Sequence, residues 1–176
     1  MMMLVHAATP QTLEDALVRA AAQGDRAAFG ELYSRYARMV HGILLARVPP
    51  ADAEDLVQDV FLSAMNQIGG LRAAAAFPGW LAAIARHRAM DHFRAARNFA
   101  PLDDHVARTR GTNGANTSMF EVLELIRSLP EAYRETLILR LVEGMTGPEI
   151  AARTGLTAES VRVNLCRGIK MLRRLL

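Results

Sequence analysis

The sequence predicts an all-α protein, and three observations support that prediction. Ala, Leu and Arg, which are good helix formers, dominate the 176 residues, and long alternating runs of Val, Ile and Thr are absent. Apolar residues recur at helical spacing through most of the chain. A stretch of about twenty residues with little periodicity divides it, which is too long for a connection inside one compact domain. We therefore expect two small helical domains joined by a flexible linker.

The first domain is expected to hold four helices after a disordered N-terminus at residues 1–10. Pro49 and Pro50 end the second helix, and Pro78 lies in the first turn of the fourth. Asp52 is a plausible N-cap for the third helix, where its charge also suits the helix dipole. The predicted helices cover residues 12–23, 26–47, 53–67 and 78–97.

The linker is predicted at residues 98–119, where Pro, Gly and Asn are frequent. The second domain then begins with helices at residues 121–128 and 130–143, and Gly144 stops the latter. The expected boundaries are therefore a disordered N-terminus at 1–10, one domain at 11–97, the linker at 98–119 and a second domain at 120–176.

The last thirty residues indicate a helix-turn-helix. Thr146 can cap a helix, with Glu149 three residues later to complete a capping box. Gly155 lies where a tight turn between helices needs a positive φ angle. Thr157 can cap the second helix. The two consecutive caps and the glycine turn favour this motif over an ordinary surface helix with a solvated basic face.

The second helix of this motif has two different faces. Four apolar residues share one side of the helical wheel: Val161, Leu165, Ile169 and Leu172. The opposite side and its flanks carry Arg162, Val163, Cys166, Arg167, Lys170 and Arg173. Residues 158–176 contain five basic residues and one acidic residue. An apolar stripe backed by a basic face is what a recognition helix in a DNA major groove requires.

The third predicted helix is acidic on one face. Residues 51–62 contain four acids and no base, and Asp55, Gln58 and Asp59 share a side with Leu62. Acids around one exposed Leu suggest a docking surface for a basic partner, although a solvated helix face would look the same. Two carboxylates without a nearby His make a poor metal site, so we expect no metal here.

The fourth predicted helix begins apolar, with Trp80, and continues basic, with four Arg and one Asp in residues 86–97. His87 is spaced to pair with Asp91, whereas His87 and His92 lie too far apart around the helix to share a metal. The preceding loop, residues 69–76, is rich in Gly and Ala and carries Arg72. Beside a Trp, such a loop can admit an unstacked base.

Composition excludes several classes of protein. A single cysteine, Cys166, allows no intramolecular disulfide and no cysteine-rich metal site. No signal peptide is evident and no run of eighteen uncharged apolar residues occurs, so we expect a cytoplasmic protein without membrane insertion. No catalytic constellation is visible, and we expect neither enzymatic activity nor a cofactor. The net charge of +3 is concentrated in two basic patches, which suggests a polyanionic partner.

Four motifs in this order resemble the extracytoplasmic function (ECF) group of sigma-70-type RNA polymerase sigma factors. They are AAQGDRAAFGELYSRY, DAEDLVQDVFLSAM, FPGWLAAIARHRAMDHFR and SLPEAYRETLILRLVEGMTGPEIAARTGLTAESVRVNLCRG. Together they cover nearly the whole chain. The resemblance implies sigma domains 2 and 4, binding to core RNA polymerase and to promoter DNA, and control by an anti-sigma factor.

The resemblance also implies residue roles. Core polymerase would bind Asp55, Gln58, Asp59 and Leu62. The −10 element would contact Leu71, Arg72, Trp80, Arg86, His87, Arg88 and Arg94. The −35 element would contact Arg162, Val163, Cys166, Arg167 and Lys170. Met65, Asn164 and Cys166 depart from residues common in the family, which affects the expected promoter sequence more than the class of protein.

Two other functions fit part of the sequence. A stand-alone helix-turn-helix regulator, which binds duplex DNA without polymerase, explains the C-terminus equally well but not the acidic helix, the Trp loop or the linker. A small helical hydrolase would need a metal or nucleophile cluster. Cys166 is expected to be a packing or base-contact residue rather than a redox switch.

Overall fold

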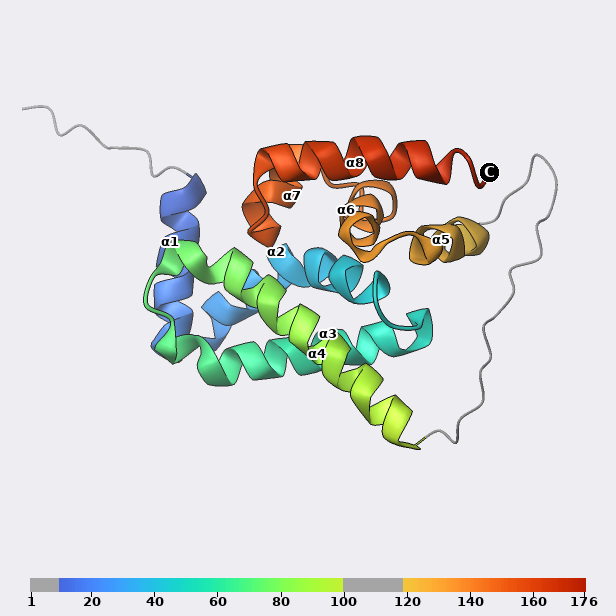
Figure 1. Cartoon of the computed structure of the whole chain (residues 1–176). Helices are drawn as coiled ribbons and strands as arrows, with labels where there is room; N and C mark the ends of the chain where they lie inside the picture. The colour runs from blue at the N-terminus through green and yellow to red at the C-terminus, as the bar shows by residue number, and fades with distance from the viewer. Residues whose placement is uncertain (1–9, 100–118) are drawn as a thin grey trace, which may run out of the picture.

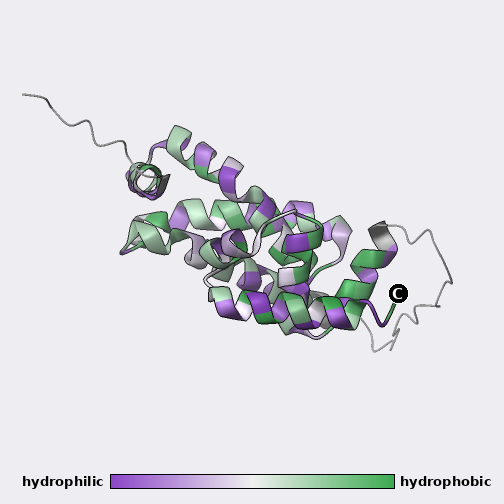
Figure 2. Cartoon of the chain, turned by 90° about the horizontal axis from the view of Figure 1, so that it is seen from above, coloured by the Kyte–Doolittle hydropathy of each residue, from purple (hydrophilic) through white to green (hydrophobic). Residues whose placement is uncertain are grey.

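Eight α-helices form the described part of the chain, and no β-strand occurs in it (Figure 1). The computed structural model describes residues 10–99 and 119–176. Residues 1–9 of the predicted disordered N-terminus and residues 100–118 of the predicted linker therefore lie outside the described residues. Pro10 begins a helix, so the predicted disorder is wrong at that residue. The helices carry hydrophobic and hydrophilic residues side by side (Figure 2), and their apolar residues pack into a common buried core. The all-α prediction is confirmed.

Helices α1 to α4, which we call the N-terminal module, pack around an apolar core. They are α1 (Pro10–Ala22), α2 (Arg26–Leu45), α3 (Pro50–Gln67) and α4 (Phe77–Phe99). Two short 3-10 turns, η1 (Ile68–Gly70) and η2 (Ala74–Ala76), connect α3 to α4. Asp25 caps α2 by accepting hydrogen bonds from the backbone N–H groups of Ala27 and Ala28 at 2.8 and 3.1 Å.

The buried Tyr36 illustrates how polar groups are accommodated in this core. Its ring meets that of Phe77 edge to face at 5.4 Å, and its hydroxyl donates to the Glu14 carboxylate. Burial, helped by the hydrogen bond to Glu14, raises the pKa of Tyr36 far above its ordinary value. The phenol is therefore a neutral structural group.

The start of α3 differs from the prediction. Asp52 is not the N-cap, because α3 begins at Pro50 and Pro49 occupies the cap position without a side-chain hydrogen bond. Proline suits the first helical turn because its missing N–H would be unsatisfied there anyway. Asp52 lies in that first turn, where its carboxylate meets His92 Nε2 at 3.2 Å and links α3 to α4.

Helices α5 to α8, which we call the C-terminal module, follow the predicted pattern closely. They are α5 (Met119–Ser128), α6 (Glu131–Leu141), α7 (Gly147–Thr154) and α8 (Ala158–Leu172). The reciprocal capping box at Thr146 and Glu149 is present, and these hydrogen bonds lower the pKa of Glu149. Gly155 has a φ of 77°, and Thr157 caps α8. The helix-turn-helix is confirmed.

Gly168 has a packing role that the sequence did not reveal. It is buried within α8, and a Cβ built on it would lie 2.9 Å from Leu137 Cδ1 and 3.2 Å from Tyr133 Cβ. The absence of a side chain at Gly168 thus allows α8 to approach α6 closely, and glycine lowers the helix propensity of α8 in return.

The two modules pack against each other: α2 contacts α6, and α4 contacts α7 (Figure 1). The turn of the helix-turn-helix reaches the start of α4, where a Cβ on Gly79 would lie 3.6 Å from the Cα of Gly155. This contact between modules was not predicted.

Candidate polymerase- and DNA-binding surfaces

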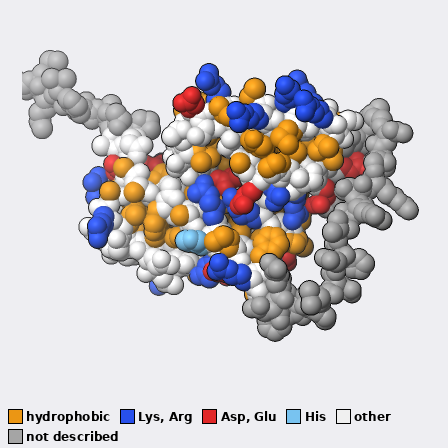
Figure 3. Space-filling view, in the orientation of Figure 1, with side chains coloured by type: hydrophobic (Ala, Val, Ile, Leu, Met, Phe, Trp, Pro, Cys, Tyr) orange, Lys and Arg blue, Asp and Glu red, His pale blue; other side chains and the backbone are white. Residues whose placement is uncertain are grey.

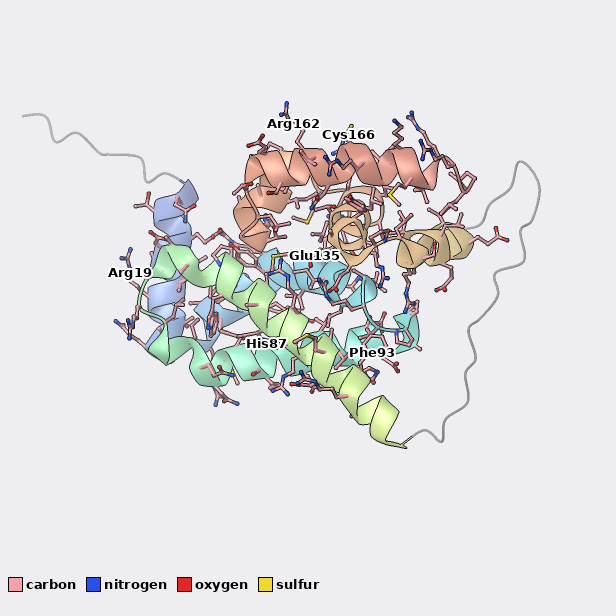
Figure 4. The ribbon with its side chains drawn as sticks, viewed as in Figure 1. Arg19, His87, Phe93, Glu135, Arg162 and Cys166 are labelled. Atoms are coloured by element: carbon pink, nitrogen blue, oxygen red, sulfur yellow. The ribbon has the colours of Figure 1, made fainter. Side chains whose placement is uncertain are left out.

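The outer face of α8 is an exposed basic surface. Arg162, Cys166, Arg167 and Lys170 are exposed, and Val163 is half-buried among them. On the inner side Val161 and Leu172 are buried, and Leu165 and Ile169 pack partly against the core. Arg162 and Cys166 project away from the rest of the molecule (Figure 4), and Lys and Arg side chains gather over α8 (Figure 3). The structure thus brings the five predicted −35 residues together on one helix side.

The outer face of α3 carries the predicted polymerase-binding set. Asp55, Gln58, Asp59 and Leu62 are all exposed, whereas the opposite side of the helix is buried. Leu62 is 55% exposed, which is unusual for a leucine beside carboxylates. An exposed apolar residue surrounded by acids can enter an apolar pocket while the acids meet a basic rim.

A groove runs beside this surface between α2, α3 and the end of α6. Gln58 and Val57 line it from α3, and Tyr33 and His41 line it from α2. Glu143 closes it from the C-terminal module. Tyr33 and His41 were not singled out from the sequence, since only the fold places α2 next to the acidic face.

The loop before α4 forms one wall of a hollow of about 340 Å³. Leu71 and Arg72 line it from the loop, together with the three alanines that follow. Asp15 and Arg19 of α1 also line it, which the sequence did not predict because both residues precede the first motif. A hollow of this volume lies in the range of small-molecule sites, so it can accept a single unstacked base.

Trp80 lies apart from this hollow. Its ring is tilted against that of Phe77, with ring centres 5.9 Å apart, and the side chain is half-buried. The lining of the hollow contains residues of α1 rather than Trp80. The predicted joint role of the loop and the tryptophan therefore stays a prediction, in which Trp80 does not line the hollow itself.

The basic residues of α4 point to different partners. Arg86 donates to both Glu135 oxygens, from Nε at 3.1 Å and from an Nη at 2.7 Å, and also to the Thr154 carbonyl. Arg88 donates to Ser63 Oγ of the neighbouring helix α3 at 3.2 Å. His87 and Arg94 are exposed, and Arg94, rather than His87, pairs with Asp91 at 3.7 Å.

The structure was also searched for metal-ligating clusters and for helices that could span a membrane. Among the described residues, no three His, Cys, Asp or Glu side chains are grouped so that they could hold a metal ion. None of the helices described here is both long and apolar enough to cross a membrane.

Comparisons with known proteins match both halves of the chain. The family described as Sigma-70 region 2 matches residues 32–99, and the family described as Sigma-70, region 4 matches residues 119–172. RNA polymerase sigma factor NccH of Alcaligenes xylosoxydans xylosoxydans is 31% identical, with 96% of this chain and 97% of that protein aligned. The ECF RNA polymerase sigma-E factor of Escherichia coli K12 is 30% identical, over 89% of this chain and 91% of its own.

The fold is shared with solved structures as well. CnrH, solved in complex with the cytosolic domain of CnrY, has a TM-score of 0.64 and 26% identity, with 92% of this chain and 96% of that chain covered. The sigma factor RpoE of Bartonella quintana, solved with the anti-sigma factor NepR, has a TM-score of 0.56 at 18% identity, over 84% and 95% of the two chains. Because both sigma-70 regions and relatives aligned over most of their length match, the chain belongs to the ECF subfamily of sigma-70-type RNA polymerase sigma factors.

Proposed function

We propose that this sigma factor docks on core RNA polymerase through the α3 face formed by Asp55, Gln58, Asp59 and Leu62. The supporting observation is the exposure of all four residues on one side of a helix whose other side is buried. Leu62 supplies apolar contact area, and the acids select a basic partner surface.

The same proposal assigns promoter recognition to two places. In α8, Arg162, Arg167 and Lys170 hold phosphates or guanine edges of the −35 element, and Val163 and Cys166 make apolar base contacts. In the N-terminal module, the hollow beside Leu71 and Arg72 receives a base of the opened −10 strand. The exposed cations of α4 hold that strand's backbone, and the half-buried Trp80 supports the start of the helix.

Residues 11–97 and 120–176 act in this proposal as sigma domains 2 and 4, and residues 98–119 act as the tether between them. The chain itself performs no covalent chemistry and needs no cofactor. It works in the cytoplasm, where the polymerase transcribes DNA. An anti-sigma factor controls it, as the family resemblance and the complex of the sigma factor RpoE with the anti-sigma factor NepR suggest.

The observation that carries this proposal is the presence of two surfaces for different partners on one chain. They are an acidic face with an exposed leucine on α3 and a basic face on α8. A stand-alone helix-turn-helix regulator needs only the second.

The test is run-off transcription with purified core RNA polymerase on a pool of genomic promoter fragments, with and without the protein. We expect discrete transcripts only when the protein is present, and their start sites give the −35 and −10 sequences. Absence of transcripts, together with tight binding of the free protein to duplex DNA, would reject the proposal in favour of the stand-alone regulator.

A further inference from the structure

The hollow beside the loop before α4 is lined by an acid and two arginines. Asp15 and Arg19 line it from α1, and Arg72 lines it from the loop. Asp15 is half-buried, whereas Arg19 and Arg72 are exposed. Figure 4 shows Arg19 on the side of α1 that lies next to this loop. The hollow therefore offers both hydrogen-bond acceptors and hydrogen-bond donors to a ligand.

Asp15 and Arg19 are placed to act together. They lie four residues apart on one face of α1, a spacing that commonly gives an ion pair along a helix. Within the part of the chain that the structure describes, neither residue takes part in an ion pair. Asp15 instead accepts a hydrogen bond from Gln11 Nε2 at 3.3 Å, which leaves most of its acceptor capacity unused.

The rest of the lining is aliphatic. Val18 and Ile68 are buried, Leu71 is half-buried, and the residues that follow Arg72 are alanines. Of the described residues that line the hollow, none is aromatic. Stacking on an aromatic ring holds any base, because every base has a π-face. Without such a ring, a base in this hollow is distinguished by the hydrogen bonds along its edges.

The charged residues match the edges of one base. A carboxylate only accepts hydrogen bonds, and a guanidinium only donates them. Guanine presents two neighbouring donors, N1–H and the N2 amino group, and two neighbouring acceptors, O6 and N7. Adenine, cytosine and thymine each present a single donor group to a carboxylate. Guanine is therefore the base that can form paired hydrogen bonds with a carboxylate and with a guanidinium at the same time.

We propose that this hollow selects guanine. Asp15 accepts hydrogen bonds from N1–H and the N2 amino group, and Arg19 donates to O6 and N7. The guanine is an unstacked base of the opened −10 strand, and Arg72 holds a neighbouring phosphate. Guanine selection rests on the proposed function, because the hollow receives a base only if the chain opens promoter DNA.

The test uses holoenzyme assembled from core RNA polymerase and the full chain. The probe is a pool of promoter fragments that share the −35 sequence found by run-off transcription. Their non-template strand carries an unpaired and randomised −10 segment, and sequencing of the bound fraction gives the base preference at each position. We expect guanine to be enriched about tenfold or more at one position.

Two substitutions test the assigned residues. Asp15→Asn replaces an acceptor by a donor, and Arg19→Lys keeps the charge but loses the planar fork of donors. Each should reduce the guanine enrichment to about twofold or less and leave the preferences at other positions unchanged. Arg26→Ala is the matched control, because Arg26 is exposed at the start of α2 and is not in the described lining of the hollow. This control should keep the native preference.

Guanine analogues at the selected position separate the two contacts. Inosine lacks the N2 amino group, and 7-deazaguanine lacks N7. Each analogue should weaken binding of the native holoenzyme about fivefold or more. Inosine should cause no further loss in Asp15→Asn, and 7-deazaguanine should cause no further loss in Arg19→Lys, because the paired contact is already absent.

Each outcome decides a different point. If fragments are bound and transcribed without a guanine preference in the −10 segment, guanine selection is wrong and the sigma function stands. A guanine preference that survives both substitutions would overturn the assignment to Asp15 and Arg19. If the holoenzyme transcribes no fragment at all, the proposed function fails, and guanine selection fails with it.

Discussion

The outer face of α8 and the arginines of α4 are both basic, yet their side chains differ in exposure and in binding partners. Arg162, Arg167 and Lys170 of α8 are exposed and lie together on one side of the helix. On α4, Arg86 is bound by Glu135 of the other module, and Arg88 donates to Ser63. One surface is complete within its own module, whereas the other depends on how the two modules are arranged. Basic composition alone therefore does not identify a cation that is free to bind DNA.

The largest expected effect is on the stability that the packing of α8 against α6 gives to the C-terminal module. Gly168→Val should destabilise the protein by about 3 kcal/mol, because the new side chain overlaps Leu137 and Tyr133 and forces α8 away from α6. Urea unfolding followed by circular dichroism measures this change. Gly30→Ala is the control, since a Cβ there meets nothing within 4 Å and should stabilise α2 by up to about 1 kcal/mol. Equal stability of the two variants would contradict the close α6–α8 packing.

The α3 surface should also act independently of the other module. Leu62→Asp should weaken binding to core polymerase roughly thirtyfold, or about 2 kcal/mol, because a charge replaces an apolar anchor. Fluorescence competition for core polymerase measures the loss. Leu13→Asp on α1 is the matched control, since Leu13 is 52% exposed and Leu62 is 55% exposed. A similar loss in both variants would show that charge in general, rather than this face, weakens binding.

The basic face of α8 should respond to the loss of a single cation. Arg167→Ala should weaken binding of the holoenzyme to a −35 duplex about tenfold, or about 1.4 kcal/mol, whether Arg167 holds a phosphate or a base. Affinity measured at several salt concentrations distinguishes the two, because loss of a phosphate contact reduces the salt slope by about one unit. Arg127→Ala on α5, where Arg127 pairs with Glu124, should change neither quantity. Unchanged affinity in Arg167→Ala would remove Arg167 from the reading face.

The smallest expected effect concerns the cap that positions the helix-turn-helix. Thr146→Ala should cost about 1 kcal/mol of stability at neutral pH, since it removes the capping hydrogen bond, and Thr146→Ser should retain most of it. The cap lowers the pKa of Glu149, so its contribution is present above the ordinary glutamate pKa and is lost as pH falls through the lowered one. The backbone N–H and the hydroxyl of Thr146 both donate to the Glu149 carboxylate, and Thr146→Ala keeps the backbone donor. Thermal unfolding from pH 7 to pH 3 should therefore show the difference between the native and Thr146→Ala proteins narrowing as Glu149 becomes protonated. A constant difference would show that the hydroxyl adds nothing to the binding of this carboxylate.

The sequence alone determined the features that depend on local chemistry. Helical periodicity predicted the all-α class and the exposed sides of α3 and α8. The helix-turn-helix was predictable because its caps and glycine turn act within a few residues of one another. The ordered motifs gave the family. The error at Asp52 was also local: an Asp suits a cap, but a proline pair can start a helix without one.

Only the tertiary structure decided how the modules meet. Arg86 and Glu135 lie on different helices, and no local pattern connects a charge on one helix to a charge on another. The same limit applies to Asp15 and Arg19, which line the hollow beside the loop before α4 and precede the first motif. Periodicity tells which side of a helix is apolar, whereas the packing of whole helices determines which charges become buried and which partner neutralises them.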